Sequence, residues 1–263
     1  MKRLLAFLLL PLFAAAQPTH APHPGGIAIV PLGVSEQAPD ARFDGKPVLV
    51  TRAGDEWLAI VGIPLDQATG TANLVVGDQR LSFTVVPHSY REQHLTVAPK
   101  FVNPDPSAQE RIADEQREIA AAMTHYRRSP VTLRALQPPI PGARSDSFGS
   151  RRFFNKEPHS PHRGMDIKGS TGTEIKAPLA GTVLLTGDFY FTGNAVFLDH
   201  GQGLVTLYAH LDSIGVEIGD RLNTGAVLGT VGATGRVTGA HLHFATYLNG
   251  TAVDPALLLE PSP

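Results

Sequence analysis

The chain has 263 residues, a hydrophobic content of 42% and a formal net charge of −2. Two modest domains with buried cores fit this length and composition, which argues against disorder as the main state. Charges of both signs are mixed without long runs of one sign, so nucleic acid is not expected as the main partner, because binding phosphates requires a basic patch. Cysteine is absent, so stability is expected to come from packing or from a metal rather than from disulfides.

The first sixteen residues have the three parts of a secretory signal peptide. Lys2 and Arg3 form a charged start, residues 4–13 form an apolar run, and three alanines give an A-x-A cleavage pattern before Gln17. The apolar run is too short to span a bilayer, which argues against a membrane anchor. Without cysteine, the cleavage point also has no lipidation site. We therefore expect an exported protein without a stable membrane anchor, either periplasmic or secreted.

Residues 17–103 are expected to form a β-sandwich-like accessory domain. Between residues 27 and 102, short apolar runs alternate with turn residues at the spacing of an all-β sandwich. The runs are IAIVPLGV, PVLVTR, EWLAIVGI, NLVVG, RLSFTVV and HLTVAPKFV. No group of residues in this region has the spacing of metal ligands or of a catalytic nucleophile.

A linking amphipathic helix is expected within residues 104–144. Ser107 and Glu110 have the spacing of a capping box, which predicts that the helix starts near Ser107. Four apolar residues fall on one helical face: Ile112, Ile119, Met123 and Tyr126. The stretch that follows is rich in proline and glycine, as in a linker that enters a new domain. The helix is therefore expected to connect two domains or to pack across their junction.

Residues 145–263 return to a pattern of strands and turns. The segments TEIKAPLAGTVLLTGD, AVFLDHGQGLVTLYAHL and VEIGDRLNTGAVLGTVGATG have the pattern of paired strands interrupted by glycines. They predict a second all-β domain with Gly-rich turns. The fold class expected for the whole chain is therefore all-β, with the one linking helix between two β domains.

Two histidine-rich stretches of this second domain, SPHRGMD and GAHLHF, lie far apart in the chain. In an extended backbone side chains alternate with period two, so His162 and Asp166 share one face, as do His241 and His243. Two imidazoles and one carboxylate are a known ligand set of catalytic zinc, which leaves a position open for water. The histidines of a lone H-x-H are more often hydrogen-bonded or exposed residues than metal ligands. The combination of H-x-x-x-D with H-x-H in one β-rich domain nevertheless indicates a metal site.

The order of several segments resembles a known family. SPHRGMDI, APLAGTV, LDHGQGLVTLYAHL, GDRLNTGAVLGTVGATG and HLHF occur in the order found in the LytM/lysostaphin-type zinc endopeptidases, which cleave peptide bonds in bacterial peptidoglycan. The resemblance runs from about Phe148 to Pro255, and the segment SFGSRRFFNKEPHSPHRG resembles exported Gram-negative members in particular. It implies a small antiparallel β-sheet with a groove along which the substrate peptide lies.

The same resemblance implies roles for five residues. His162, Asp166 and His243 would bind zinc, with one zinc ion per chain. His210 and His241 would be catalytic histidines that do not bind the metal.

Three further residues are candidates for the substrate groove. His159 lies close to the ligand motif and is expected at the rim. Tyr208 stands two residues before His210, so strand alternation would turn both side chains toward the groove. Asn194 is a weaker candidate and could equally be a turn residue. His200 precedes turn glycines, so a structural hydrogen bond is expected for it instead.

The expected function is that of an exported zinc endopeptidase. It would use metal-activated water to hydrolyse peptide bonds in peptidoglycan stem peptides or crosslinks during cell-wall remodelling. Peptidoglycan peptides are the expected partners, and a monomer is the expected oligomeric state.

Three alternatives stand beside this function. A carrier or phosphotransfer domain would be cytoplasmic, and a carrier would present a lysine at a hairpin tip, so the signal peptide and the ligand set argue against both. A non-catalytic activator of another wall hydrolase would typically lack zinc ligands, whereas all three positions are filled here. A secreted protease of the same fold that acts on glycine-rich proteins would use the same chemistry, and the sequence does not exclude it.

Overall fold

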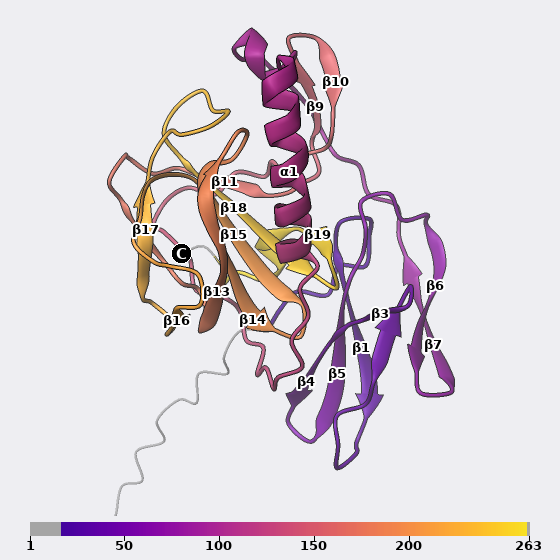
Figure 1. The fold of residues 1–263 in the computed structure, drawn as a ribbon. Helices are drawn as coiled ribbons and strands as arrows, with labels where there is room; N and C mark the ends of the chain where they lie inside the picture. The colour runs from indigo at the N-terminus through magenta and orange to yellow at the C-terminus, as the bar shows by residue number, and fades with distance from the viewer. Residues whose placement is uncertain (1–16, 262–263) are drawn as a thin grey trace, which may run out of the picture.

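A computed structural model describes residues 17–261, and the expected signal peptide at residues 1–16 lies outside the described residues. The regular secondary structure of the described chain is mostly β, with one α-helix, α1 (Pro106–Met123), between N-terminal sheets and a large antiparallel C-terminal sheet (Figure 1). Two short 3-10 helices are η1 (Pro99–Phe101) and η2 (Pro255–Leu257). The predicted fold class is confirmed. Within residues 17–261, no helix is long and apolar enough to cross a membrane.

The N-terminal part consists of two small sheets that enclose a core. One sheet has the order β1-β5-β4 and the other β3-β2-β6-β7. Their strands are β1 (Ile27–Gly33), β2 (Ala41–Phe43), β3 (Lys46–Pro47), β4 (Leu49–Ala53), β5 (Glu56–Gly62), β6 (Gly70–Val76) and β7 (Gln79–Val85). Residues from both sheets form one buried cluster, which includes Phe43, Ala59 and Leu74. The two facing sheets therefore match the predicted sandwich-like arrangement.

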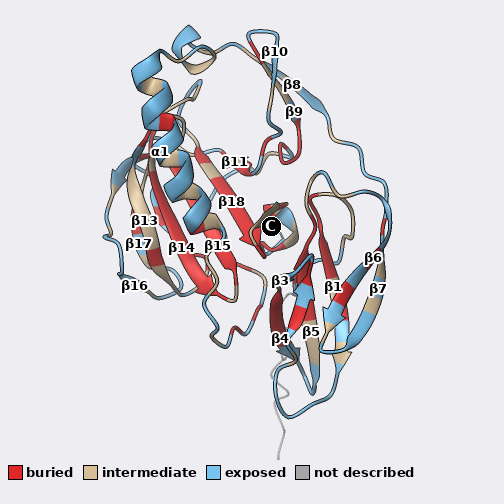
Figure 2. Ribbon diagram, turned by 45° about the vertical axis from the view of Figure 1, so that its right-hand side comes forward, coloured by how far each residue is buried: buried red, intermediate tan, exposed pale blue. Residues whose placement is uncertain are grey.

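The C-terminal part is built on a nine-stranded antiparallel sheet with the central order β11-β18-β15-β14-β13-β16. β17 pairs with β12 and β15, and β19 pairs with β18. The strands are β11 (Met165–Ile167), β12 (Glu174–Lys176), β13 (Gly181–Phe189), β14 (Gly193–Gly201), β15 (Leu204–Ile214), β16 (Arg221–Leu222), β17 (Val227–Val231), β18 (Leu242–Leu248) and β19 (Thr251–Val253). The middle strands β14, β15 and β18 are mostly buried, because both of their faces are covered (Figure 2). The site described below lies at one end of this buried sheet.

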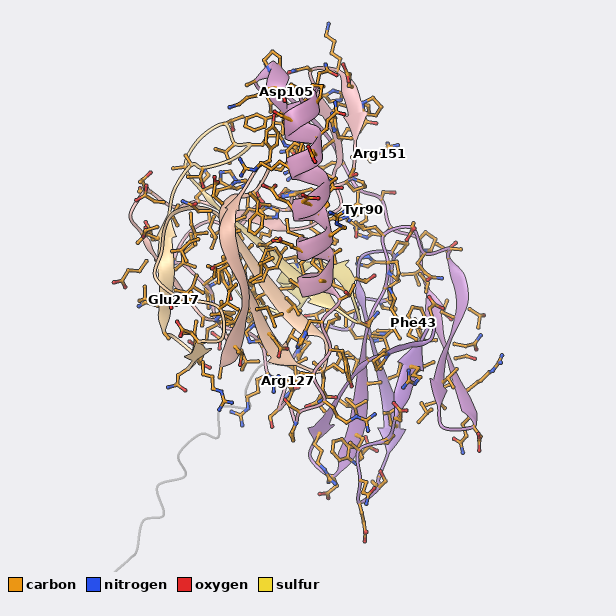
Figure 3. All side chains as sticks on the ribbon, in the orientation of Figure 1. Phe43, Tyr90, Asp105, Arg127, Arg151 and Glu217 are labelled. Atoms are coloured by element: carbon orange, nitrogen blue, oxygen red, sulfur yellow. The ribbon has the colours of Figure 1, made fainter. Side chains whose placement is uncertain are left out.

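Helix α1 covers one face of the C-terminal sheet. Its side chains Ile119, Ala122 and Met123 pack with buried residues of β14, β15 and β18, while most of the helix faces solvent (Figure 2). The helix begins at Pro106 with Asp105 as its N-cap (Figure 3), and Asp105 Oδ1 accepts hydrogen bonds from Ala108 N at 2.9 Å and from the Ser107 hydroxyl at 2.8 Å. The predicted capping box at Ser107 was therefore wrong. Proline suits the first helical position, which needs no N–H donor, so the cap lies one residue before it.

The N-terminal and C-terminal parts share one buried cluster at their junction. Ile27, Leu49 and Ile60 of the N-terminal sheet belong to the same apolar cluster as residues of the C-terminal sheet. Two amide side chains also bind the backbone of the N-terminal part. Gln202 Oε1 accepts from Val50 N at 3.0 Å and its Nε2 donates to Val50 O at 3.0 Å. Asn249 makes the same pair of bonds with Gly62, at 2.8 and 3.1 Å.

A third, small sheet lies beside the C-terminal part and has the order β10-β9-β8. Its strands are β8 (Glu92–Leu95), β9 (Arg151–Phe154) and β10 (Glu157–His159). The sequence suggested that the run containing β8 was the last strand of the sandwich. Instead, β8 pairs in parallel with β9, whose residues lie 59 positions later in the chain than their partners in β8 (Glu92 opposite Arg151). This pairing brings side chains of the N-terminal half to the edge of the site.

Candidate metal centre

Three side chains at one end of the C-terminal sheet bring their donor atoms together. Asp166 on β11 lies opposite His243 on β18 in the antiparallel register, so both side chains project from the same face. His162 comes from the segment just before β11. The His162 Nε2 to His243 Nδ1 distance is 2.9 Å, His243 Nδ1 to Asp166 Oδ1 is 3.1 Å, and His162 Nε2 to Asp166 Oδ1 is 3.4 Å.

This arrangement fits a divalent metal. Ligand atoms bound tetrahedrally at about 2.0–2.1 Å from zinc lie about 3.3 Å apart, close to the observed separations. The Nδ1–H of His162 donates to Ser147 O at 3.1 Å, which leaves an unprotonated Nε2 directed toward Asp166. Such a bond from the second ring nitrogen to a carbonyl is a usual feature of metal-binding histidines, because it fixes the tautomer and the ring orientation. Imidazole and carboxylate ligands together suit zinc.

Gly164 makes room for the ring of His243. A Cβ atom at this position would lie 2.6 Å from Cε1 and 2.7 Å from Nε2 of His243, closer than any ordinary contact. The imidazole therefore packs directly against the backbone between His162 and Asp166. Any side chain at residue 164 would displace one of the three donors.

Two further histidines lie beside the three donors. The His210 and His241 ring centroids are 5.1 Å apart, and His241 Nε2 lies 3.7 Å from Asp166 Oδ1. The Nδ1–H of His210 donates to Thr234 O at 2.9 Å, and that of His241 donates to Gly239 O at 2.8 Å. In both rings Nε2 is therefore the nitrogen that remains for chemistry in the site.

Burial sets the charge of these groups. It lowers the pKa of His162 to about 4, and burial together with the neighbouring His243 and His241 lowers the pKa of His210 to about 3. Burial opposes ionisation of Asp166, but its close contacts with the rings of His162 and His243 outweigh burial and hold the pKa of that carboxyl below its ordinary value. At neutral pH His162 and His210 are therefore neutral and Asp166 is a carboxylate, and a neutral imidazole and a carboxylate are the forms that bind metals.

A pocket opens over this cluster. One wall comes from the segment at and after β8, a second from β9, and a third from the loop between β17 and β18, at residues 232–241. The lining residues are Gln93, Leu95, Val97, Arg152, Phe154, Asp166, His210, Arg236, Val237, Thr238, His241 and His243. Residues of the N-terminal half thus form part of the wall around the candidate metal centre.

Two parts of the chain match known families. Residues 160–255 match peptidase family M23, and residues 20–88 match the peptidase family M23 N-terminal domain. A crystal structure of a putative peptidase M23 from Pseudomonas aeruginosa is 38% identical in sequence, with a TM-score of 0.79, and the match covers 91% of this chain and 96% of that chain. The chain belongs to peptidase family M23. The family predicted from the ordered sequence segments is therefore confirmed.

Curated relatives align with about half of this M23 chain. The DD-carboxypeptidase/endopeptidase Mpg of Neisseria meningitidis serogroup B is 37% identical over 119 residues, which are 45% of this chain and 27% of Mpg. The peptidoglycan DD-endopeptidase ShyC of Vibrio cholerae is 35% identical over 137 residues, which are 52% of this chain and 30% of ShyC. The chain thus matches less than a third of the length of these two relatives.

The three candidate groove residues do not line the pocket. Tyr208 is fully buried, and its hydroxyl bonds to Thr206 Oγ1 at 2.8 Å, so the expectation that it faces the groove was wrong. Asn194 is a strand residue whose amide donates to the carbonyls of Leu211 and Asp212, at 3.2 and 3.3 Å. The ring of His159 packs against Phe154 with centroids 4.8 Å apart, and His159 lies outside the pocket lining.

Several residues of the site were missed from the sequence. Gly164 lies between the suspected ligands His162 and Asp166. A glycine at that position could have indicated that a neighbouring group packs against the backbone there. No sequence pattern indicated that Gln93, Arg152 and Arg236 belong to the pocket. Their positions there depend on the β8–β9 pairing and on the path of the loop before β18. Ser147 contributes only a backbone carbonyl, which any residue supplies.

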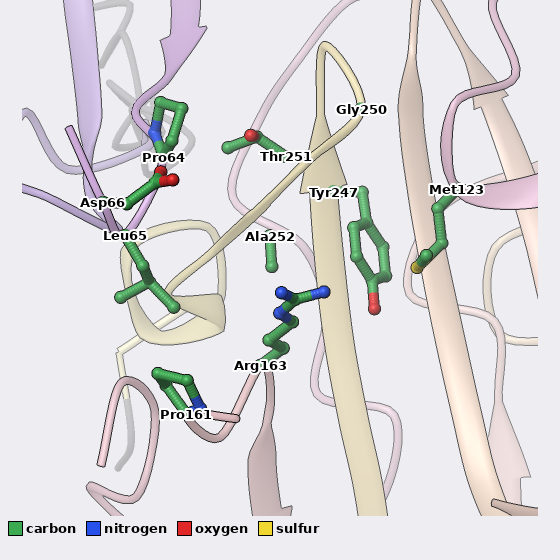
Figure 4. Close-up of a pocket in the computed structure, with 10 residues that line it drawn as sticks. All are labelled: Pro64, Leu65, Asp66, Met123, Pro161, Arg163, Tyr247, Gly250, Thr251 and Ala252. Atoms are coloured by element: carbon green, nitrogen blue, oxygen red, sulfur yellow. The ribbon is translucent and has the colours of Figure 1, made fainter. Parts of the chain in front are cut away.

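A second hollow lies at the junction of the two parts and contains none of the five suspected metal-centre side chains. It is lined by Pro64, Leu65, Asp66, Met123, Pro161, Arg163, Tyr247, Gly250, Thr251 and Ala252 (Figure 4). The figure shows residues of the N-terminal part on one side and Tyr247 and Met123 on the other. Pro161 and Arg163 flank His162, so this junction lies directly behind the segment that carries one suspected ligand.

Proposed function

We propose that the protein is an exported zinc endopeptidase that hydrolyses crosslinks between the stem peptides of peptidoglycan. The observation that carries this proposal is the convergence of the donor atoms of His162, Asp166 and His243 within 3.4 Å of one another. Membership of a peptidase family supports hydrolysis of a peptide bond. Relatives named DD-endopeptidases support a crosslink between D-configured centres as the bond cut. Export rests on the signal-peptide pattern of residues 1–16.

In this proposal His162, Asp166 and His243 hold one zinc ion per chain and leave the fourth position open. Zinc in such a site polarises a carbonyl group and lowers the pKa of water to about 7. Asp166 supplies the only carboxylate in the pocket lining, and it offsets part of the metal charge. The side chains of Leu95 and Val97 give the wall an apolar portion that limits water around the scissile bond.

His210 and His241 act on the substrate rather than on the metal. Each ring donates its Nδ1–H to a backbone carbonyl, so its unprotonated Nε2 faces the site. An Nε2 placed there accepts a proton from the attacking water and passes it to the leaving amine. The carbonyls of Thr234 and Gly239 hold both rings in the orientation that this transfer requires.

Digestion of purified sacculi, followed by mass spectrometry of the released peptides, tests the proposal. The parent protein should contain zinc and release peptides cut at the crosslink. His243→Ala should lose both the zinc and the cleavage. His125→Ala is a matched control, because His125 is a half-exposed histidine 3.8 Å from Asp199 and outside the pocket lining. Zinc-loaded parent protein that leaves every crosslink intact but stimulates another wall hydrolase would favour the activator alternative.

A further inference from the structure

Two arginine side chains stand in the wall of the pocket. Arg152 comes from β9, and Arg236 comes from the loop between β17 and β18. Their guanidinium carbons lie 5.9 Å and 4.4 Å from the centroid of the same ring, Phe154. Arg236 also lies 4.5 Å from the ring centroid of Phe191, so its guanidinium is held between two aromatic rings.

The two arginines differ in their partners. Arg152 Nε donates to Gln93 Oε1 at 3.0 Å, and a terminal nitrogen lies 3.7 Å from Asp166 Oδ2. The guanidinium of Arg236 makes no hydrogen bond or ion pair with residues 17–261, although it is only partly exposed. Aromatic rings hold a guanidinium through their faces but satisfy none of its five N–H donors. Arg236 therefore carries a set of donors with no protein acceptor.

Arg236 remains charged in this setting. Burial, and then the nearby Arg152, lower its pKa to about 10, which is still well above neutral pH. Keeping an unpaired charge away from water is unfavourable, and an acceptor of opposite charge removes that penalty. The position of Arg236 in the pocket lining means that such an acceptor can arrive with a substrate.

The charge of the pocket favours an anion. Among its lining residues the charged side chains other than histidine are Arg152, Arg236 and Asp166, which is one positive charge in excess. Any cation bound by Asp166 would offset its negative charge and increase this excess. A carboxylate is the group on a peptide that matches a guanidinium, because its two oxygens accept parallel N–H bonds in one plane.

We propose that Arg236, supported by Arg152, binds a free carboxylate of the substrate peptide next to the bond that is cut. Arg236 is then a specificity-determining residue, and the protein discriminates against peptides in which that carboxylate is amidated. This inference rests on the proposed endopeptidase function. The competing interpretation is that the stacked Arg236 only supports residues 232–241.

Two synthetic crosslinked peptides, identical except that one carboxylate beside the scissile bond is replaced by a carboxamide, separate these interpretations. For the parent protein, kcat/KM should be at least about tenfold higher on the carboxylate peptide, since charge-assisted pairs are the stronger hydrogen bonds. Arg236→Gln should lose this preference, mainly through a higher KM on the carboxylate peptide, with unchanged zinc content. Arg236→Lys should keep part of it, because it retains the charge without the planar fork.

Arg52→Gln is the matched control. Arg52 also stacks on an aromatic ring, 4.4 Å from the centroid of Trp57, but it lies in the N-terminal part on β4. This variant should keep the full preference for the carboxylate peptide. If Arg236→Gln does not fold, the comparison is made with Arg236→Lys, and a parental preference in that variant contradicts bidentate carboxylate binding.

Two outcomes would overturn the inference while the endopeptidase function stands. In the first, the parent protein cleaves both peptides with equal kcat/KM. In the second, Arg236→Gln lowers kcat/KM by the same factor on both peptides. If the parent cleaves neither peptide, the proposed function fails, and calorimetric binding of the two peptides to zinc-loaded protein decides the inference alone. Tighter binding of the carboxylate peptide that depends on Arg236 supports it, and equal binding of both peptides rejects it.

Discussion

Tyr208 and His210 lie two residues apart on β15, yet their side chains occupy opposite faces of the sheet. Tyr208 packs in the apolar core with Phe244, whereas His210 lines the pocket beside His241. The cause is a β-bulge. Between the pairs Val196–Tyr208 and Asn194–Leu211, two residues of β15 oppose the single residue Ala195, and His210 adopts a φ of 67°. Bulges redirect side chains in this way, and a non-glycine residue at positive φ marks local strain that surrounding bonds must hold.

The bulge is expected to depend on Asn194, whose amide donates to the carbonyls of Leu211 and Asp212. Asn194→Ala should lower turnover about tenfold or more, because small displacements of catalytic groups are costly, and it should reduce the free energy of unfolding by roughly 1–2 kcal/mol. Zinc content should not change, since none of the three suspected ligands contacts this amide. Asn73→Ala, which removes an exposed amide that binds Ser82, serves as the control in the same assays. Parental turnover in Asn194→Ala would show that the bulge holds without this side chain.

The catalytic roles proposed for His210 and His241 can be separated from metal binding. His210→Ala and His241→Ala should retain near-normal zinc but lose on the order of 10²–10³ in turnover, the usual effect of removing one group that acts in the transition state. His243→Ala should lose both its zinc and its turnover. Paired metal analysis and kinetics on one defined crosslinked muropeptide provide the check. Loss of zinc from His210→Ala would contradict the assignment.

Gly164→Ala should weaken metal binding without touching a ligand. Its added Cβ would lie 2.6 Å from Cε1 of His243, so the ring must move away from His162 and Asp166. Displacing a ligand by loss of its support typically costs about 10–100-fold in metal affinity. Competition titration with a zinc chelator measures this change. Gly215→Ala is the control, because a Cβ there would have no neighbour closer than 3.7 Å, and similar affinities in the two variants would refute the packing argument.

Stability should fall in mild acid because of His200. This histidine donates from Nδ1 to Ala180 O at 2.9 Å, and its Nε2 accepts from the Thr206 hydroxyl at 2.9 Å, which in turn accepts from the Tyr208 hydroxyl. The neutral ring satisfies this chain of bonds, as expected from its sequence context, and burial lowers the pKa of His200 to about 4 from its ordinary 6.5. The unfolded chain therefore takes up a proton between pH 6.5 and 4 that the folded protein does not. The stabilisation is complete above pH 6.5 and is lost as the pH falls toward 4, by roughly 3 kcal/mol.

Denaturant unfolding of the parent protein and of His200→Gln at several pH values between 4 and 7 tests this prediction. Both proteins carry the same metal centre, so the difference between their pH dependences isolates His200. The stability of His200→Gln should change less with pH than that of the parent. Equal slopes in the two proteins would assign the acid sensitivity to other groups.

The sequence predicted the features that follow from strand periodicity and failed where periodicity is broken. The pairs His162 with Asp166 and His241 with His243 were readable, because period-two alternation places residues of one segment without knowledge of the partner strand. Tyr208 was misplaced because one extra residue in β15 reverses the alternation, and nothing in the local sequence marks it. Arg236 was missed because its role depends on two aromatic rings, Phe154 and Phe191, from other segments of the fold.

The paired amide bonds of Gln202 and Asn249 also constrain the order in which the protein is assembled. The N-terminal strands are synthesised first, but the backbone at Val50 and Gly62 finds these partners only after residues 202 and 249 have been made. A domain that emerges first normally completes its own fold early. Here its last contacts arrive with the end of the chain, as does His243. The Asn249–Gly62 bonds and the candidate metal centre therefore both form only after most of the chain has been made, and a chain interrupted before residue 243 would have neither.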